Sequence, residues 1–469
     1  MSQTRPPSSA EETSGGGGEP SLKQVMGPGL LLLFIIGDIL GTGIYALTGD
    51  VAGEVGGAAW LPFAIAFTVA LITACSYLEL VTKYPQAAGA ALYVHKAFGK
   101  HLLTFLVCFA VMCSGITSAS AASRAFAANL AVGFGLDVGN GVILLIALAF
   151  MLLVLAVNLR GVGESVKINV LLTAVELSGL LIVILISLYF ILGGNADFSR
   201  VVAFETASDK SVFLAVSTAT SLAFFAMVGF EDSVNMAEET KNPARIFPRM
   251  MFTGLGITGL IYVLVSVCAV AVVPVGQLSA SETPLATVVQ TAAPGFPISD
   301  LLPFISMFAV ANSALINMLM ASRLLYGMGK QGVLPPFLAK VHPGRRTPQG
   351  AIVFTTVIAL GLITFVSLSP DSPVVSLLGG TTSLLLLAVF TLVNVSVLVL
   401  RREKAATGHF SAGRVLPVVG AITCLYLVLP WSSGRPAGQY EIAGVLLALG
   451  LILWMATWYA RKKENARAG

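Results

Sequence analysis

The chain has 469 residues, of which 56% are hydrophobic and only 11% are charged, and its mean hydropathy is +0.88. A soluble protein of this length needs far more charge to cover its surface, so the composition excludes an ordinary soluble domain. The net charge of +4 reflects basic loops beside apolar segments and does not indicate a nucleic-acid-binding surface.

Residues 1–22 are polar and glycine-rich, which predicts a disordered tail. They lack the apolar core of a cleavable signal peptide, so we expect the first span to direct insertion. Apolar runs of about 20 residues, the length that crosses a bilayer as a helix, then recur along nearly the whole chain. They predict twelve spans, at residues 28–50, 58–82, 101–131, 139–159, 167–193, 212–236, 248–274, 299–326, 348–368, 373–400, 415–431 and 440–460.

Lysine and arginine are distributed unequally between the two sets of loops. With the N-terminus in the cytosol, 23 of them fall on the cytosolic side and 3 on the opposite side, while Arg124 lies inside the third span. Cytosolic loops of membrane proteins are enriched in these residues. The bias predicts a multi-pass protein of the cell membrane with both termini in the cytoplasm.

The residue types that carry most catalysis and metal binding are poorly placed for either. The five cysteines all fall in apolar spans without a C-x-x-C pair, and the four histidines all fall in predicted cytosolic loops. We find no nucleophile–base pair and no nucleotide-binding loop. We therefore expect neither an enzyme nor a metal, a cofactor or a nucleic-acid partner.

The first predicted span is interrupted at its centre by "GTGIY", with Gly41 and Gly43 near mid-depth. One such pair in a span favours close helix packing, but the sixth span carries a similar interruption at Gly229, followed by Glu231 and Asp232. Acidic side chains inside a span mark a functional site by default. Paired interruptions in two halves of a chain are typical of a transporter binding site.

The spacing of the two interruptions predicts the architecture. Gly41 and Gly229 lie 188 residues apart, in the first and sixth spans, and a repeat of five spans must insert its second copy upside down. We therefore predict an all-α membrane protein with a five-plus-five inverted repeat, broken helices 1 and 6, and two extra helices. The predicted units are residues 1–22 (tail), 23–193 (first repeat), 212–400 (second repeat), 414–461 (last two spans) and 462–469 (cytosolic tail).

The breaks also predict what is bound. The half of span 1 that begins after Gly43 turns free N–H groups and a positive dipole end toward the cavity, which suits a carboxylate. The half that ends near Asp38 exposes carbonyl groups, as does span 6 before its own break, and these suit an ammonium group. A site with both features fits a zwitterion such as an amino acid.

Five motifs in order resemble the amino acid–polyamine–organocation superfamily of secondary transporters, over roughly residues 23–460. They are "GTGIY" (41–45), "SYLELVTKYPQAAGAALYV" (76–94), "VNLRGVGESVKIN" (157–169), "GFEDSVNMAEETKNPARIFP" (229–248) and "ASRLLYGMGKQGVLPPFLAKVHP" (321–343). In the second motif, Ala90 replaces a glycine of the family pattern. The resemblance implies the inverted-repeat fold and transport of an amino acid or amine.

By matching positions, the resemblance also implies roles for individual residues. It assigns Phe225 to an aromatic that closes over the substrate, and Glu231 to an acid involved in gating or proton sensitivity. Contacts with the substrate's amino and carboxyl groups, or the lining of the unwound part of span 6, are assigned to Ile39, Thr42, Gly43, Ile44, Ala226 and Gly229.

One departure from the family pattern concerns coupling. Many proton-linked relatives carry a lysine in span 5 where this chain has Glu176. A buried carboxylate there either carries the coupled proton or binds a cation. Asp38 either lies near the ammonium group, couples to Glu176, or is a solvated acid of the cytosolic vestibule. We expect Glu79 to hold the loop before Pro85.

The sequence favours an amino acid transporter working by alternating access, with proton symport expected and sodium coupling left open. Small apolar residues near Phe225 and Ala226 suit a neutral amino acid, whereas Glu231 and Asp38 keep a cationic one open. A polyamine or organic cation transporter and an amino acid exchanger are the alternatives. A channel is disfavoured, because channels use pore loops or charge rings rather than two matching breaks. The expected partners are a small-molecule amino acid, a proton or sodium ion, and the bilayer.

Overall fold

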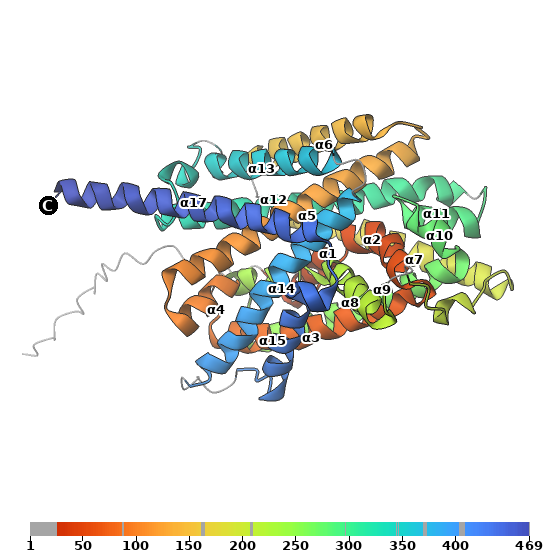
Figure 1. The fold of residues 1–469 in the computed structure, drawn as a ribbon, viewed down its shortest axis with the longest axis horizontal. Coiled ribbons are helices and arrows are strands. Elements are labelled where there is room, and N and C mark those ends of the chain that lie inside the picture. The colour runs from red at the N-terminus through yellow and green to blue at the C-terminus, as the bar shows by residue number, and fades with distance from the viewer. Residues whose placement is uncertain are drawn as a thin grey trace, which may run out of the picture.

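The protein is all-helical in the part of the chain that the computed structural model describes (Figure 1). The described residues are 26–86, 89–160, 165–206, 210–295, 297–343, 345, 347–368, 373–402 and 409–468. No β-strand occurs among them, apart from two isolated bridges. The predicted tail at 1–22 lies outside this range.

Eleven segments of the described chain are long and apolar enough to cross a membrane. Each coincides with a span predicted from hydropathy. They are formed by α1 (Pro28–Ile39) with α2 (Thr42–Val55), α3 (Trp60–Lys83), α5 (His101–Gly133), α6 (Asn140–Arg160), α7 (Ser165–Leu192), α8 (Val212–Ala223) with two 3-10 turns (Phe224–Met227 and Asp232–Glu239), α9 (Pro243–Val272), α12 (Pro297–Lys330), α13 (Gln349–Ser367), α14 (Val374–Leu400) and α17 (Ala437–Ala468).

The remaining predicted span, at 415–431, is a shorter helix. α15 (Val415–Val428) has 14 residues and is followed by α16 (Pro430–Ser433). A helix needs about 20 residues to cross the hydrocarbon core. α15 ends just before Pro430, because proline is tolerated in the first turn of a helix, here α16, but breaks the interior of a helix. The described chain therefore has eleven segments that are each long enough to cross the membrane, rather than the twelve expected.

The long helices run lengthwise through the molecule, and short helices lie at its two ends (Figure 1). α10 (Val275–Ser279) and α11 (Pro284–Ala292) lie at one end. α4 (Gly89–Phe98) lies at the other, where the C-terminal part of α17 projects. α6 and α13 pack side by side along one edge. Their outward side chains include exposed Leu145 and Phe365, as expected of a surface that faces lipid.

The two interrupted segments are the most enclosed. The apolar window of Pro28–Val55 is 78% buried and that of Val212–Ala237 is 72% buried, against 33% for Asn140–Arg160. Backbone that leaves the helical hydrogen-bonding pattern cannot face lipid, because its N–H and C=O groups would have no partner there. Placing both interrupted segments at the centre, among α3, α5, α9, α12 and α14, meets that requirement.

Ion pairs tie both ends of the bundle together. Arg124 is only 5% exposed, and its Nη2 donates to Glu282 Oε1, between α10 and α11, at 2.6 Å and to Asn140 Oδ1 at 3.0 Å. At the other end, Glu79 accepts from Arg401 Nε and Nη2 (2.7 and 2.6 Å) and from the Ala412 backbone N–H (2.8 Å).

The expectation for Glu79 was therefore wrong about the loop it holds. Its carboxylate binds the end of α14 and the chain that leads to α15, not the loop before Pro85. Both carboxylate oxygens are used, and the hydrogen bonds to Glu79 raise the pKa of Arg401. Charged, two-pronged pairs of this kind are the stronger hydrogen bonds in proteins.

We expect Glu79→Gln to destabilise the protein by about 2 kcal/mol, because it leaves Arg401 without its anion and the Ala412 N–H with a weaker acceptor. The measurement is the melting temperature in detergent. Glu441→Gln serves as the control, since Glu441 is exposed on α17. Equal melting temperatures for the two variants would show that the pair does not hold α14 to α3.

Candidate functional site

The first interruption lies between α1 and α2. α1 ends at Ile39 and α2 begins at Thr42, and Gly41 between them has φ +147°, a conformation that other residues rarely adopt. The Tyr262 hydroxyl of α9 donates to the Ile39 carbonyl at 2.6 Å, so one carbonyl freed by the break is satisfied. The first N–H groups of α2 have no helical partner because no turn precedes them.

The second interruption follows α8. The chain changes to a 3-10 turn at Phe224 and then passes through Gly229, which has φ +123°. Glu231 folds back and accepts the Gly229 backbone N–H at 2.9 Å through Oε2. This buried carboxylate therefore serves first to satisfy backbone that the break has freed.

The two interruptions touch, and we call their contact the crossing. A Cβ placed on Gly229 would lie 2.6 Å from the carbonyl of Asp38, and one placed on Gly43 would collide with the backbone of Ala226. Only glycine permits these approaches. The structure thus brings all the predicted substrate residues to one buried place: Ile39, Thr42, Gly43, Ile44, Phe225, Ala226 and Gly229.

On the side toward α10, the crossing is covered by two apolar side chains. A Cβ on Gly379 of α14 would lie 3.1 Å from the Phe225 ring and 3.2 Å from Leu47 Cδ1. Leu47 lies further along α2, near Gly49, which packs closely against Leu278 of α10. Phe225 and Leu47 therefore fill the space between the crossing and that end of the molecule.

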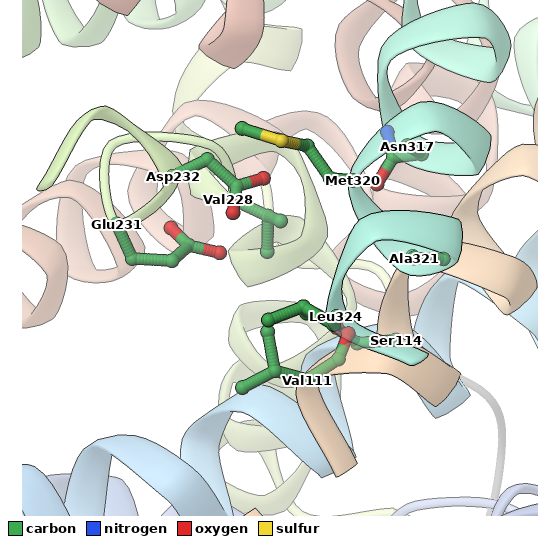
Figure 2. Close-up of a pocket in the computed structure, with 10 residues that line it drawn as sticks. Val111, Ser114, Val228, Glu231, Asp232, Asn317, Met320, Ala321 and Leu324 are labelled. Atoms are coloured by element: carbon green, nitrogen blue, oxygen red, sulfur yellow. Dashed lines mark hydrogen bonds between the residues drawn. The ribbon is translucent and has the colours of Figure 1, made fainter. Parts of the chain in front are cut away.

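On the opposite side, the crossing borders a small, partly open cavity (Figure 2). Figure 2 shows Glu231 and Asp232 on one side of it and residues of α5 and α12, among them Ser114 and Asn317, on the other. A second small cavity shares both acids and extends to α4. Among the described residues that line the two cavities there is no lysine, arginine or histidine, so their charge favours a cation.

Another buried acid, Glu176, lies between α1, α7 and α12. Gly37 packs directly against Thr173, which brings the end of α1 to α7 one turn from Glu176. Glu176 is fully buried, and Asn312 lies beside it without good hydrogen-bond geometry. The Tyr45 hydroxyl donates to the Glu176 backbone carbonyl at 2.7 Å, not to its carboxylate.

Several buried polar atoms of this region have no hydrogen-bond partner within the described residues. They are both carboxylate oxygens of Glu176, both side-chain polar atoms of Asn312, Oδ2 of Asp38 and Oγ1 of Thr42. Unpaired polar groups are costly in a dry interior, and most buried groups are satisfied. Their concentration here marks a place where a proton, an ion or a polar solute would be stabilised.

The predicted residues thus form two adjoining groups rather than one pocket. Glu231 lines the cavities, whereas Glu176 lies with Asn312 where α7 meets α1 and α12, and Asp38 adjoins both groups. Sequence reasoning noted Asp232 as an acid inside span 6 without giving it a role, and it missed Asn312 and Asn317. The two amides stand in the apolar stretch "VANSALINM" of α12, and polar side chains inside a span were the available signal.

Comparisons with known proteins agree with this architecture. The branched-chain amino acid permease BcaP of Bacillus subtilis is 26% identical over 96% of this chain and 95% of its own length. A methylthioribose transporter of the same organism is 27% identical over 91% and 90%. The vacuolar cationic amino acid transporter 4 of Arabidopsis thaliana is 29% identical over 78% of this chain and 61% of its own.

A solved manganese transporter of Eremococcus coleocola, crystallised as a single-residue mutant, shares the fold, with a TM-score of 0.58 and 15% identity over 93% of this chain and 94% of that one. The family model described as "Amino acid permease" matches residues 30–456, which include both interruptions that form the crossing. The chain therefore belongs to the amino acid permease family.

Proposed function

We propose that this permease is a secondary transporter that carries amino acids across the cytoplasmic membrane by alternating access. The observation that carries the proposal is the buried crossing, where Gly43 meets Ala226 and Gly229 meets Asp38. Backbone freed from helical bonding at this depth needs polar partners. A solute that enters and leaves can supply them in turn.

The crossing offers one partner for each end of an amino acid. The N–H groups at the start of α2, from Thr42 to Ile44, and the positive dipole end of that helix suit the carboxylate. The carbonyl groups at the end of α1 and around Ala226 suit the ammonium group. Phe225 closes over the substrate from the side of α10, where its ring already covers the crossing against Gly379.

The wider topology follows the same reasoning. We propose that residues 23–193 and 212–400 are inverted repeats and that 414–461 form two additional spans. In this arrangement α15 and α16 together serve as the eleventh span. The breaks support it, because each falls in the first helix of its half and each contains a glycine with positive φ, Gly41 and Gly229. The excess of lysine and arginine on one set of loops supports our proposal that both termini lie in the cytoplasm.

Alternating access requires that the two sides of the crossing open in turn. In the described conformation, the side toward α10 is filled by Phe225 and Leu47, while the side toward α4 contains the two small cavities. We assign this conformation to the inward-facing half of the cycle. Glu231, which binds the Gly229 N–H, is placed to respond when this backbone moves.

We propose proton symport with Glu176 as the proton carrier, assisted by Asp38 or Glu231. Glu176 is fully buried, and its carboxylate has no hydrogen-bond partner among the described residues. An ionised carboxylate is strongly disfavoured in such a place unless a cation joins it. Protonation relieves the penalty, and sodium binding is the other way to do so.

A second candidate is transport of a cationic amino acid or another organic cation, including by exchange. Two acids, Glu231 and Asp232, line both cavities, and no basic residue lines them within the described chain. A positively charged side chain leaving the crossing would meet these acids first. The cationic amino acid transporter among the relatives makes this candidate worth testing beside neutral amino acids.

The experiment that tests the proposed function is uptake of labelled amino acids into proteoliposomes, neutral and cationic, with and without an inward proton gradient. A transporter gives saturable uptake that is accelerated by unlabelled substrate on the far side. A channel gives flux without saturation or counterflow. Flux of the second kind would contradict the proposal.

We expect Gly43→Leu to lower uptake at least about tenfold, equivalent to ~1.4 kcal/mol or more of lost binding. The leucine side chain would occupy the space where α2 meets Ala226 and cover the N–H groups at the helix start. Gly141→Leu is the control, because nothing lies within 4 Å of a Cβ at that position. Both proteins must remain monodisperse in detergent. Normal uptake by the Gly43 variant would remove α2 from the binding site.

The chemistry of the two substrate ends gives a further expectation. Because the start of α2 needs a carboxylate, amino acid amides and decarboxylated amines should compete poorly for uptake. Competition by unlabelled analogues measures this directly. Strong competition by simple amines would favour the organic cation candidate and transfer recognition to Glu231 and Asp232.

If Glu176 carries the proton, Glu176→Gln fixes a neutral side chain at that position. Proton-driven accumulation should then be lost, while exchange of internal for external substrate should persist because it needs no net proton movement. Both are measured in the same proteoliposomes, with Glu231→Gln as the comparison. Full proton-driven accumulation by the Glu176 variant would move coupling to Glu231 or Asp38. A requirement for sodium in the unmodified protein would contradict proton coupling altogether.

A further inference from the structure

Arg435, in the connection between α16 and α17, is only 7% exposed, and its guanidinium group contacts four helices. Its Nε donates to the Leu427 carbonyl at 2.8 Å. Its Nη1 donates to the Gly380 carbonyl (2.8 Å), to Ser383 Oγ (2.9 Å) and to Gln439 Oε1 (2.9 Å), and its Nη2 donates to the Ser221 carbonyl at 3.3 Å. The acceptors belong to α15, α14, α17 and α8.

This arginine is held by dipoles rather than by an acid. No carboxylate pairs with it within the described part of the chain. Burial lowers the pKa of Arg435 to about 9, so the group remains charged at neutral pH. A buried cation without a counter-ion depends on every oxygen that surrounds it, because each lost hydrogen bond leaves part of its desolvation cost without compensation. The guanidinium therefore constrains where these backbone carbonyls lie.

Two of the carbonyls belong to the segments that form the cover over the crossing. Ser221 lies one helical turn before Phe225, at the end of α8 where the helix changes to a 3-10 turn. Gly380 follows Gly379, the residue against which the Phe225 ring packs. Ser383 reinforces the connection, because its hydroxyl contacts both the Ser221 carbonyl (2.7 Å) and the Gly380 carbonyl (3.0 Å).

The glycine pair in α14 lets one stretch of backbone serve both contacts. A Cβ on Gly379 would press on Phe225 and Leu47, and a Cβ on Gly380 would collide with the side chain of Gln439. The Phe225 ring and the Arg435 cluster thus pack against adjacent residues of the same helix. A shift of α14 relative to α8 would disturb both at once.

We infer that Arg435 is a positioning residue of the gate on the α10 side: it holds the backbone of α8 to that of α14 and so sets the Phe225 ring against Gly379. The inference rests on the proposed role of Phe225 as a gate. It gives the last helices, which lie outside the two repeats, a part in controlling access to the site. Opening this side requires the bonds from Arg435 to Ser221 or to Gly380 to break.

The test measures access to the crossing as the rate at which a thiol reagent labels the variant Thr42→Cys. Thr42 is buried at the crossing, which Phe225 and Leu47 cover on the α10 side, so a membrane-impermeant thiol reagent added outside intact cells should label Thr42→Cys slowly. Adding Arg435→Gln should raise the labelling rate about tenfold, a population shift of ~1.4 kcal/mol toward the open gate. Arg435→Lys keeps the positive charge but loses the planar guanidinium group with its several N–H donors, and should give an intermediate labelling rate.

Four controls make the labelling result interpretable. The parent chain, with its native cysteines, gives the background, and Arg414→Gln, an exposed arginine beside α15, should leave the rate unchanged. Phe225→Ala should raise labelling as Arg435→Gln does. The double variant should label no faster than Phe225→Ala alone, because both changes act through one gate. An additive increase would mean that Arg435 only stabilises the bundle, and would overturn the inference.

The outcomes separate the inference from the function on which it rests. Labelling needs no transported substrate. If Thr42→Cys with Phe225→Ala is labelled no faster than Thr42→Cys alone, Phe225 does not act as a gate. If Phe225→Ala labels faster and Arg435→Gln does not, only the inference about Arg435 fails. Should Arg435→Gln not accumulate in the membrane, Ser383→Ala removes a single hydroxyl from the same cluster and should raise labelling in its place, whereas an unchanged rate would count against the inference.

Discussion

The constraint on which this structure depends is that no backbone N–H or C=O group can meet lipid without a partner. Two segments violate helical hydrogen bonding, at Gly41 and at Gly229, and both lie among the surrounding helices rather than at the surface. Their carbonyls and N–H groups are partly satisfied by Tyr262 and by Glu231. What those side chains leave unsatisfied gives the crossing its capacity to hold a polar solute.

Much of this could be predicted from the sequence, because the signals are local. A run of apolar residues long enough to cross a bilayer needs no knowledge of its neighbours, and glycine with nearby acids at mid-depth signals a break. The predicted spans and the breaks rest on such signals, whereas the assignment of Ile39, Gly43 and Ala226 to one site came from the resemblance to a transporter superfamily. The shortness of α15 was not predicted, because its apolar stretch continues in the sequence through Pro430 and only the backbone shows where the helix ends.

What was missed depends on packing between distant segments. Glu79 reaches Arg401, Arg124 reaches Glu282, and Asn312 lies beside Glu176, each across more than a hundred residues of chain. No pattern in one segment indicates which other segment it meets. The cluster around Arg435 belongs to the same class. Its guanidinium is informative only once the carbonyls of four helices are seen around it.

The measurement that tests this account most directly is an experimental structure of the protein with a transported amino acid bound. The account predicts the substrate at the crossing, its carboxylate oxygens within hydrogen-bonding distance of the N–H groups from Thr42 to Ile44 and its ammonium group beside the carbonyls at the end of α1. A substrate bound away from both breaks, with Gly43 still packed against Ala226, would contradict it.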